Sequence, residues 1–198
     1  MIIKRDDNMK PGFKKIAVFF SLFFLVHAVA HGQDCNDNMQ VVTPNERFDD
    51  QGNGTVLDKN TGLVWKKCSE GQTYNSLSGS CDGAARQFVS NEALAFEGNI
   101  NNTGYAGYKD WRVPNIKELS SIVESSCANP AINIVVFRNT PSGYFRSSTL
   151  SVDGFYCVNF ADGVTSRKCD QSGTGPGGMG GMGGFTDVTE GYLRFVRN

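Results

Sequence analysis

Cysteine is the residue type with the most chemistry to offer in this chain of 198 residues. The six cysteines are Cys35, Cys68, Cys81, Cys127, Cys157 and Cys169. No two of them form a C-x-x-C pair, and neither His27 nor His31 falls in a ligand pattern, so zinc binding is not expected. An even number of cysteines in an exported chain instead predicts disulfides. Complete pairing leaves no thiol of low pKa for nucleophilic catalysis.

Spacing along the chain favours one of the fifteen pairings that six cysteines allow. The expected pairs are Cys68–Cys81, Cys157–Cys169 and Cys35–Cys127. The first pair flanks a polar loop rich in glycine and serine, and the second flanks a candidate hairpin. The third is then left to tie the N-terminal arm to the end of a helix. Each short loop closed in this way would stabilise the fold by roughly 3 kcal/mol in the chain-entropy model.

Residues 1–30 have the composition of a targeting segment. A basic start precedes an apolar stretch that ends in Ala28-Val29-Ala30, the small-x-small pattern that signal peptidase cuts. The stretch is shorter than the ~20 apolar residues of a membrane-spanning helix. We therefore predict a cleaved signal peptide, with a retained membrane anchor as the alternative, and no membrane span after cleavage. The expected location is the periplasm, the cell surface or the external medium.

The charge balance argues against one class of partner. The net charge is −1, and residues 1–30 carry five basic and two acidic residues, so cleavage leaves a mature chain of charge −4. A nucleic-acid binder held by phosphate contacts needs a basic face, so no nucleic-acid partner is expected. Aromatic residues make up 11% of the chain and charged residues only 20%, which argues against a disordered protein.

Other catalytic patterns are missing from the sequence. There is no G-x-S-x-G elbow, and cleavage after Gly32 would remove both histidines, which leaves no base for a Ser–His–Asp hydrolase. Asp49, Asn53 and Gly54 resemble part of a calcium loop. Asn60 stands where an EF-hand needs a glutamate, so a tight turn is the preferred interpretation. We predict a protein that is not an enzyme and that has no cofactor and no metal.

The elements that must position these residues follow from periodicity and turn signals. Short runs rich in Val, Leu, Phe, Thr and Trp predict a β-meander over residues 47–67. Helices are predicted over residues 82–98 and from Asn115 onward, where Glu118 stands at the capping-box spacing. The rest of the chain returns to strands, beginning with INIVVF and ending with GYLRFVRN. The Gly/Met-rich segment 173–185 is predicted to be a long loop.

A family resemblance rests on six strings in a fixed order: GNGTVLDKNTGLVWKKC, GYKDWRVPNIKELSSIVESSC, NPAIN, FRSST, VNFADG and LRFVRN. Together they resemble the DUF1566 family, also called the Lcl C-terminal domain family, a bacterial exported domain. The resemblance covers residues 47–198 and leaves residues 31–46 as an N-terminal arm. The family is similar to the C-type-lectin-like and formylglycine-generating-enzyme fold group. This similarity implies an α+β, C-type-lectin-like fold, stapled by disulfides, in which two helices pack on a twisted antiparallel sheet and the terminal strands lie close together.

The shared motifs single out seven residues with an expected structural role: Trp65, Trp111, Arg112, Pro114, Glu118, Arg194 and Arg197. The two tryptophans are expected to fill the core. Arg112 is expected to be forked to a carboxylate, either Asp58 or Asp110. The chain departs from the family pattern in two places. Arg146 stands where a tryptophan is frequent, and Phe195 stands where a cysteine is frequent between the last two arginines.

The resemblance implies an exported, non-catalytic binding or adhesion module. Its partner would be a surface glycan, with a sulfated glycosaminoglycan as one candidate, or an envelope or host protein. Arginine and aromatic side chains near loop ends suit such contacts, and the candidates are Arg138, Tyr144, Arg146 and Tyr156. Ordinary strand surface is the alternative for these four. Two other functions stay open, an enzyme of the formylglycine-generating type and a structural accessory of an envelope assembly, and by analogy a trimer is open too.

Overall fold

The computed structural model describes residues 32–152, 154–169 and 190–198. The chain divides into two units, residues 1–30 and residues 31–198, and all described residues belong to the second. The predicted signal peptide and the Gly/Met-rich segment 173–185 lie outside the described residues. None of the helices described is long and apolar enough to cross a membrane.

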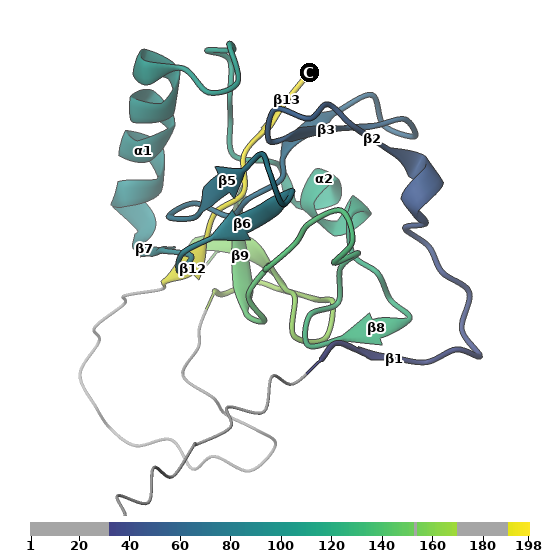
Figure 1. The fold of residues 1–198 in the computed structure, drawn as a ribbon. Coiled ribbons are helices and arrows are strands. Elements are labelled where there is room, and N and C mark those ends of the chain that lie inside the picture. Colours follow the sequence, from purple (N-terminus) through teal and green to yellow (C-terminus); the bar gives the residue numbers. More distant parts are fainter. Residues whose placement is uncertain (1–31, 153, 170–189) are drawn as a thin grey trace, which may run out of the picture. The chain divides into compact units, whose positions relative to one another are not determined.

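Short strands dominate the described part of the chain, together with two α-helices (Figure 1). The helices are α1 (Ser90–Thr103) and α2 (Ile116–Ser121), and a 3-10 turn covers Asn45–Arg47. The strands are β1 (Asp34–Cys35), β2 (Phe48–Asp50), β3 (Thr55–Asp58), β4 (Val64–Lys66), β5 (Thr73–Asn75), β6 (Ser80–Asp82), β7 (Gln87–Phe88), β8 (Cys127–Ala128), β9 (Tyr144–Ser151), β10 (Gly154–Asn159), β11 (Val164–Ser166), β12 (Gly191–Tyr192) and β13 (Val196–Arg197). The fold is therefore α+β, as predicted.

The strands form two larger sheets and two small ones. One larger sheet has the order β11-β10-β9-β12-β7 and the other the order β13-β4-β3-β2, while β1 pairs with β8 and β5 with β6. All pairs are antiparallel except β12 with β9, so the expected single antiparallel sheet is replaced by several sheets with one parallel contact. The first and last strands of the predicted domain, β2 and β13, lie at opposite edges of the same sheet rather than side by side.

The predicted β-meander over residues 47–67 is confirmed as strands β2, β3 and β4. The loop that resembled a calcium site is a turn, in which the Asn53 carboxamide oxygen accepts hydrogen bonds from the amide and hydroxyl of Thr55. Gly54 has a φ of +88°, and a Cβ there would lie 2.3 Å from the Tyr105 hydroxyl. This turn therefore depends on glycine for both its conformation and its contact.

Three predicted elements differ from the structure. The helix expected over residues 82–98 begins at Ser90 and ends at Thr103, because Asp82 is used in the hairpin β5–β6. The run INIVVF forms turns rather than a strand, since the Asn133 side chain accepts from the amides of Val135 and Val136 and so occupies them locally. The final segment divides into β12 and β13, which belong to different sheets.

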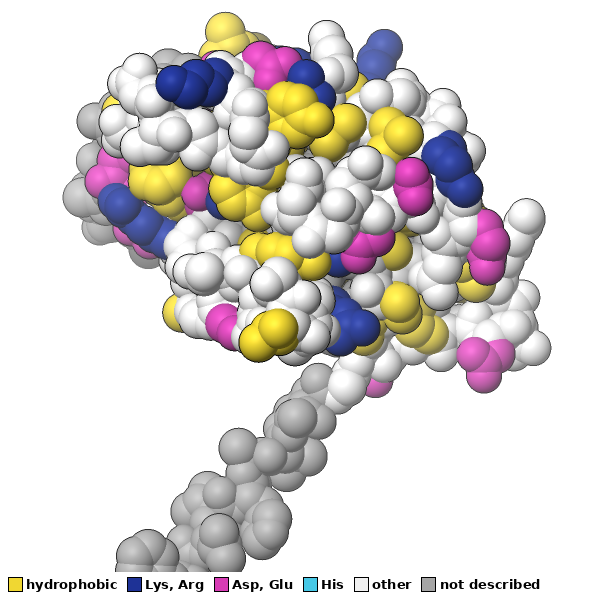
Figure 2. Space-filling view, turned by 45° about the horizontal axis from the view of Figure 1, so that its top comes forward, with side chains coloured by type: hydrophobic (Ala, Val, Ile, Leu, Met, Phe, Trp, Pro, Cys, Tyr) yellow, Lys and Arg dark blue, Asp and Glu magenta, His cyan; other side chains and the backbone are white. Residues whose placement is uncertain are grey.

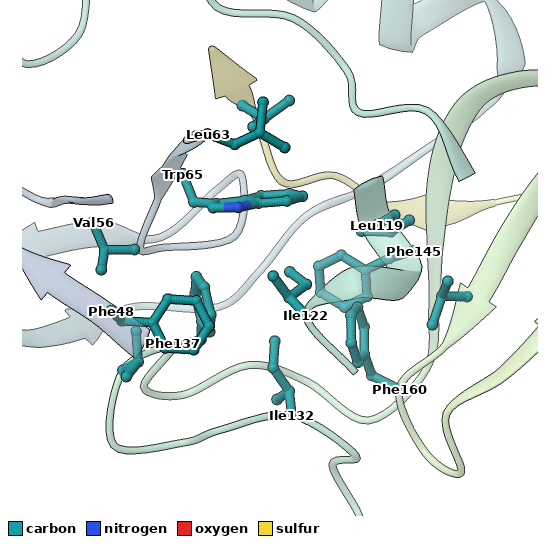
Figure 3. Close-up of a cluster of buried hydrophobic side chains, with 13 residues drawn as sticks. Phe48, Val56, Leu63, Trp65, Leu119, Ile122, Ile132, Phe137, Phe145 and Phe160 are labelled. Carbon is teal, nitrogen blue, oxygen red and sulfur yellow. The ribbon is translucent and has the colours of Figure 1, made fainter. Parts of the chain in front are cut away.

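Two clusters of buried side chains make up the core. In the first, Leu119 and Ile122 of the α2 region pack with Trp65 of β4 and with aromatic residues of β9 and its neighbours (Figure 3). In the second, Ala93 and Ile100 of α1 pack with Trp111 and with the segment between β12 and β13. Both tryptophans are almost fully buried, which confirms their predicted place in the core.

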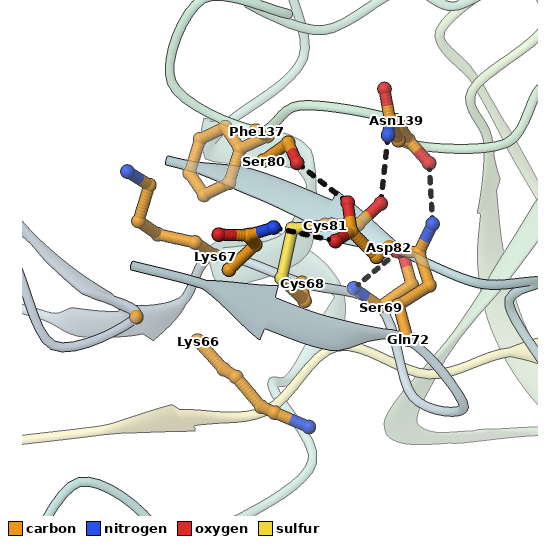
Figure 4. The surroundings of a disulfide bond; sticks show 12 residues. Lys66, Lys67, Cys68, Ser69, Gln72, Ser80, Cys81, Asp82, Phe137 and Asn139 are labelled. Atoms are coloured by element: carbon orange, nitrogen blue, oxygen red, sulfur yellow. Dashed lines mark hydrogen bonds between the residues drawn. A yellow bond between two sulfur atoms is a disulfide. The ribbon is translucent and has the colours of Figure 1, made fainter. Parts of the chain in front are cut away.

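All three predicted disulfides are present, so no cysteine is free. Cys68–Cys81 joins the end of β4 to the hairpin β5–β6 (Figure 4). Cys157–Cys169 joins β10 to the chain after β11. Cys35–Cys127 joins β1 to β8, where the two cysteines are paired in register, and so ties down the N-terminal arm.

Glu124 holds the N-terminal arm from the other side. Its carboxylate is almost fully buried and accepts hydrogen bonds from the amides of Val42, Thr43 and Ser126 and from the hydroxyls of Thr43 and Ser126. Burial by itself would raise the pKa of Glu124, but the hydrogen bonds from Ser126 and Thr43 outweigh it and lower the pKa to about 2. The arm is therefore fixed by a disulfide and by a buried carboxylate.

We expect Glu124→Gln to destabilise the fold by roughly 2–3 kcal/mol, because several buried donors lose a charged acceptor. The folded-state pKa lies below the ordinary value of 4.5, so the ionised carboxylate stabilises the fold fully above that pH and its contribution is lost as the pH falls toward 2. Urea unfolding from pH 7 down to pH 3 measures both effects, and the exposed Glu46→Gln is the matched control. A Glu124→Gln protein with the stability and acid sensitivity of the control would contradict this assignment.

The three disulfides should differ in their resistance to reduction. Cys35 is exposed and Cys127 partly so, whereas the other four cysteines are nearly or completely buried. A thiolate reductant must reach a sulfur atom, so mild reduction of the folded protein should open Cys35–Cys127 first. Alkylation followed by peptide mapping at increasing reductant measures the order. Earlier labelling of Cys68 or Cys81 would contradict the buried position of that pair.

Candidate ligand-binding site

The W-R-V-P motif builds an ion pair at the start of α2. Both terminal nitrogens of Arg112 donate to Glu118, over 2.8 and 2.9 Å. The predicted capping box is also present, because the Asn115 side chain accepts from the amide of Glu118 and Glu118 accepts from the amide of Asn115. Burial alone would raise the pKa of Glu118, but the hydrogen bonds from Arg112 and Asn115 lower it. The Glu118 carboxylate therefore serves both the ion pair with Arg112 and the cap of α2.

The expected carboxylate partner of Arg112 was wrong. Asp58 is paired with Arg47, and Asp110 with Arg197. The sequence predicts Glu118 as a helix cap, and its two carboxylate oxygens have enough lone pairs to accept from the Asn115 amide and from the Arg112 guanidinium together.

Arg194 is fully buried and holds several backbone segments together. It donates to the carbonyls of Lys66 and Lys67 and to the hydroxyls of Ser69 and Thr140, the last at 2.7 Å. Its guanidinium stacks 4.8 Å from the centroid of the Phe137 ring. Desolvation lowers the pKa of Arg194 to about 9. The residue is thus a structural cation, and its contact with Thr140 reaches the loop next to Arg138.

The four candidate ligand contacts do not form one surface. Arg138 is exposed and lines an open depression. Arg146 is only 2% exposed and lines a different, narrower cavity. Tyr144 and Tyr156 are half-buried within β9 and β10. Of the four candidates, Arg138 is therefore the one that is both exposed to solvent and part of the lining of a depression.

The depression beside Arg138 has a volume of about 440 Å³. Its lining consists of Gly32, Gln33, Asn129, Pro130, Ile134, Val135, Arg138, Asn139 and Thr140, and we call it the Arg138 depression. Three carboxamides, a hydroxyl and a guanidinium thus surround a hollow whose remaining walls are aliphatic. Such a set offers several hydrogen-bond donors and acceptors over an apolar floor.

The polar groups of the Arg138 depression are held in place from behind. Asn139 donates to the Cys81 carbonyl at 2.7 Å, and its own carbonyl accepts from the Gln72 side chain at 2.9 Å (Figure 4). Gln33 donates to two carbonyls, those of Pro130 and Ile132. Asn139 has a φ of 55°, a left-handed conformation that asparagine tolerates better than most residues. Asn139 is therefore positioned by the hairpin β5–β6, which the Cys68–Cys81 disulfide links to the chain after β4.

Sequence reasoning found Arg138 but missed the rest of this depression. The sequence predicts a strand for the run INIVVF, whereas the structure has turns there that leave Ile134 and Val135 exposed. Two asparagines near prolines, in Asn129-Pro130 and Asn139-Thr140-Pro141, are the signal in the sequence for turns at this place, because asparagine and proline favour turns. The contacts of Asn139 with Gln72 and Cys81 span too much sequence to be read from local patterns.

Charges are mixed on the face shown in Figure 2. Basic and acidic side chains are interspersed there, and hydrophobic side chains lie among them. Within the residues that the structure describes, no group of three or more His, Cys, Asp or Glu side chains is placed to hold a metal ion. Among the residues that line the Arg138 depression, all of which the structure describes, Arg138 carries the one charge.

The second cavity has a volume of about 240 Å³ and lies between α1 and the hairpin β9–β10. Its lining consists of Ala93, Glu97, Val113, Arg146, Ser147, Ser148, Leu150 and Phe155, and we call it the Arg146 cavity. The Arg146 guanidinium stacks 4.2 Å from the centroid of the Phe155 ring.

Comparison with known proteins connects these features to one family. A family model described as the Lcl C-terminal domain matches residues 54–174. No curated protein and no solved structure matches the chain. The matched residues are more than half of the chain, lie within the predicted domain of residues 47–198, and include the Arg112–Glu118 pair and both hollows' arginines. The chain therefore belongs to the Lcl C-terminal domain family.

Proposed function

We propose that this chain is an exported, non-catalytic binding module that recognises a surface glycan in the Arg138 depression. The observation that carries the proposal is the lining of that depression. The Arg138 guanidinium and the carboxamide oxygens of the lining suit the hydroxyl groups of a sugar, and its aliphatic walls suit the C–H faces of a sugar ring. Its volume of about 440 Å³ is within the range of about 300–1,000 Å³ that small-ligand sites occupy.

Arg138 gives the proposed site a preference for an anionic sugar. A guanidinium can make two parallel hydrogen bonds to a carboxylate or to a sulfate-like group. The mature chain carries a net charge of −4, so a long polyanion gains little from the overall field. The ligand class we propose is therefore a short sugar that carries a sulfate or a uronic acid, as glycosaminoglycans do.

The cysteine pairing supports binding over catalysis. An enzyme of the formylglycine-generating type would need a reactive thiol, and all six cysteines here are joined in disulfides. Three disulfides are also typical of proteins from an oxidising compartment, which supports export to the periplasm, the cell surface or the medium. A C-type-lectin-like arrangement is part of this proposal, and its support is the W-R-V-P entrance into α2 and the R-F-V-R segment that ends in β13.

A protein partner is the second candidate. Val41, Ile134 and Val135 are exposed hydrophobic residues that line one shallow hollow, and Val135 is 57% exposed. Ile134 and Val135 also line the Arg138 depression. Clustered exposed hydrophobic residues are typical of protein contact surfaces. An envelope or host protein, or a second and third copy of this chain, would cover them.

We expect the purified mature protein to bind sulfated or uronic-acid disaccharides on a glycan array, and to bind their neutral counterparts more weakly. Arg138→Ala should weaken the affinity about tenfold, which corresponds to about 1.4 kcal/mol. High salt should weaken binding because Arg138 is exposed to solvent. The matched control is Arg167→Ala, which removes the same charge from an exposed residue outside the depression.

Two results would contradict the proposed site. One is an equal loss of affinity in Arg138→Ala and Arg167→Ala, because it would indicate a general charge effect. The other is a lack of binding to every glycan by a protein whose thermal unfolding is normal. Capture of a defined envelope protein, lost on Val135→Asp and kept on Arg138→Ala, would favour the second candidate instead.

A further inference from the structure

Most of the N-terminal arm lies on the domain without burying side chains of its own. Every residue in the range 34–42 is exposed, and Thr43 is the first that is fully buried. Figure 1 shows this part of the chain leaving β1 and passing along the outside of the domain toward β2. A terminal segment that buries no apolar surface does not offset the conformational entropy lost on ordering, unless a specific link ties it down.

Two links of different chemistry tie the arm to the domain. At one end, the buried Glu124 carboxylate accepts from the amides of Val42 and Thr43. At the other end, the disulfide joins Cys35 to Cys127, and the pairing of β1 with β8 around it covers two residues on each strand. The disulfide is therefore the main anchor for the part of the arm that precedes Val42.

This anchor is open to attack by a thiolate. Cys35 is exposed and Cys127 half-buried, whereas the cysteines of the other two disulfides are at most 2% exposed. One thiolate of a dithiol can attack the Cys35 sulfur and form a mixed disulfide, with Cys127 as the leaving thiolate. The second thiolate of the dithiol then displaces Cys35. The pair takes up two electrons and two protons, and the reductant leaves as a disulfide.

The same end of the arm forms one wall of the Arg138 depression. Gly32 and Gln33 are lining residues, and both precede the disulfide by only a few positions. The Gln33 carboxamide nitrogen donates to the carbonyls of Pro130 and Ile132, over 2.6 Å in each case. Pro130 lines the depression as well. Release of the arm would therefore remove this wall and expose two carbonyls to water.

We propose that Cys35–Cys127 is a redox-active disulfide which takes a dithiol as its reductant and controls the Arg138 depression. In the oxidised protein the arm is fixed and the depression is complete. In the reduced protein residues 32–41 leave the surface, whereas the Glu124 anchor keeps the rest of the arm in place. The resulting change in sugar affinity rests on the proposed function, but the release of the arm does not.

Backbone order parameters from nuclear magnetic resonance test the release directly. The mature protein is measured oxidised, and again after the lowest concentration of dithiothreitol at which iodoacetamide labels Cys35 and Cys127. In the oxidised protein, residues 34–41 should have the values of rigid backbone, about 0.85, and after reduction they should fall below about 0.6. Thr43 should keep its value. The amide signal of Ile132 should shift, because the Gln33 side chain has left its carbonyl.

Two variants separate the anchor from the wall. The double variant Cys35→Ser/Cys127→Ser should have a mobile arm without any reductant and should not respond to dithiothreitol. Gln33→Ala keeps the disulfide, so its arm should stay ordered in residues 34–41. Opening the pair in the wild-type protein should weaken binding of a sulfated disaccharide at least about tenfold, and Gln33→Ala should weaken it with the arm still ordered.

Three results would overturn the assignment. The first is an arm that stays ordered when Cys35 and Cys127 are both alkylated, because the disulfide would then not be its anchor. The second is labelling of Cys68 or Cys157 at the same reductant concentration, because the pair would then not be a selective redox site. The third is a released arm with unchanged affinity for a disaccharide that binds the oxidised protein. An oxidised protein that binds no sugar contradicts the proposed function alone, since the order parameters still decide the release.

Discussion

The buried guanidinium of Arg194 is the interaction around which the rest of the structure is organised. A cation that has left water must have its donors satisfied, or the fold pays a large desolvation penalty. Here the two terminal nitrogens donate to the carbonyls of Lys66 and Lys67 and to the hydroxyls of Ser69 and Thr140, and the aromatic ring of Phe137 covers the guanidinium. Within the part of the chain that the structure describes, Nε has no hydrogen-bond partner. Three segments that are far apart in sequence must therefore meet around one side chain. Thr140, one of the residues that Arg194 contacts, also lines the Arg138 depression.

Disulfides and ion pairs hold together further parts of the scaffold around Arg194. Cys68–Cys81 holds the hairpin that orients Asn139, and Cys35–Cys127 together with Glu124 holds the N-terminal arm. Several charges are satisfied within the protein, as in Arg47–Asp58, Lys66–Glu70 and Arg112–Glu118. The chain thus commits its cysteines and many of its strongest charges to the scaffold. In the Arg138 depression the scaffold presents a small number of positioned polar groups beside aliphatic side chains.

Local chemistry explains which parts of this arrangement could be predicted from sequence. The capping box at Asn115 and Glu118, the turns of the β-meander and the disulfides that close short loops all depend on neighbours in the chain. The start of α1 could not be predicted, because it depends on the use of Asp82 in a hairpin. The turns of INIVVF depend on one asparagine side chain, Asn133, which outweighs the β-propensity of five apolar neighbours. The candidate sites depend on contacts between distant segments, so the sequence indicated single arginines but not the hollows that they line.

Disulfide mapping of the mature protein asks whether the scaffold uses every thiol, which is the observation that the proposed binding role rests on. The protein is collected without reductant, unfolded in the presence of an alkylating agent, digested and analysed by mass spectrometry. The account predicts no alkylated cysteine and three linked peptide pairs, Cys35–Cys127, Cys68–Cys81 and Cys157–Cys169. A stoichiometrically alkylated cysteine in the folded protein would contradict this pairing and would remove the support that it gives to the proposed binding role.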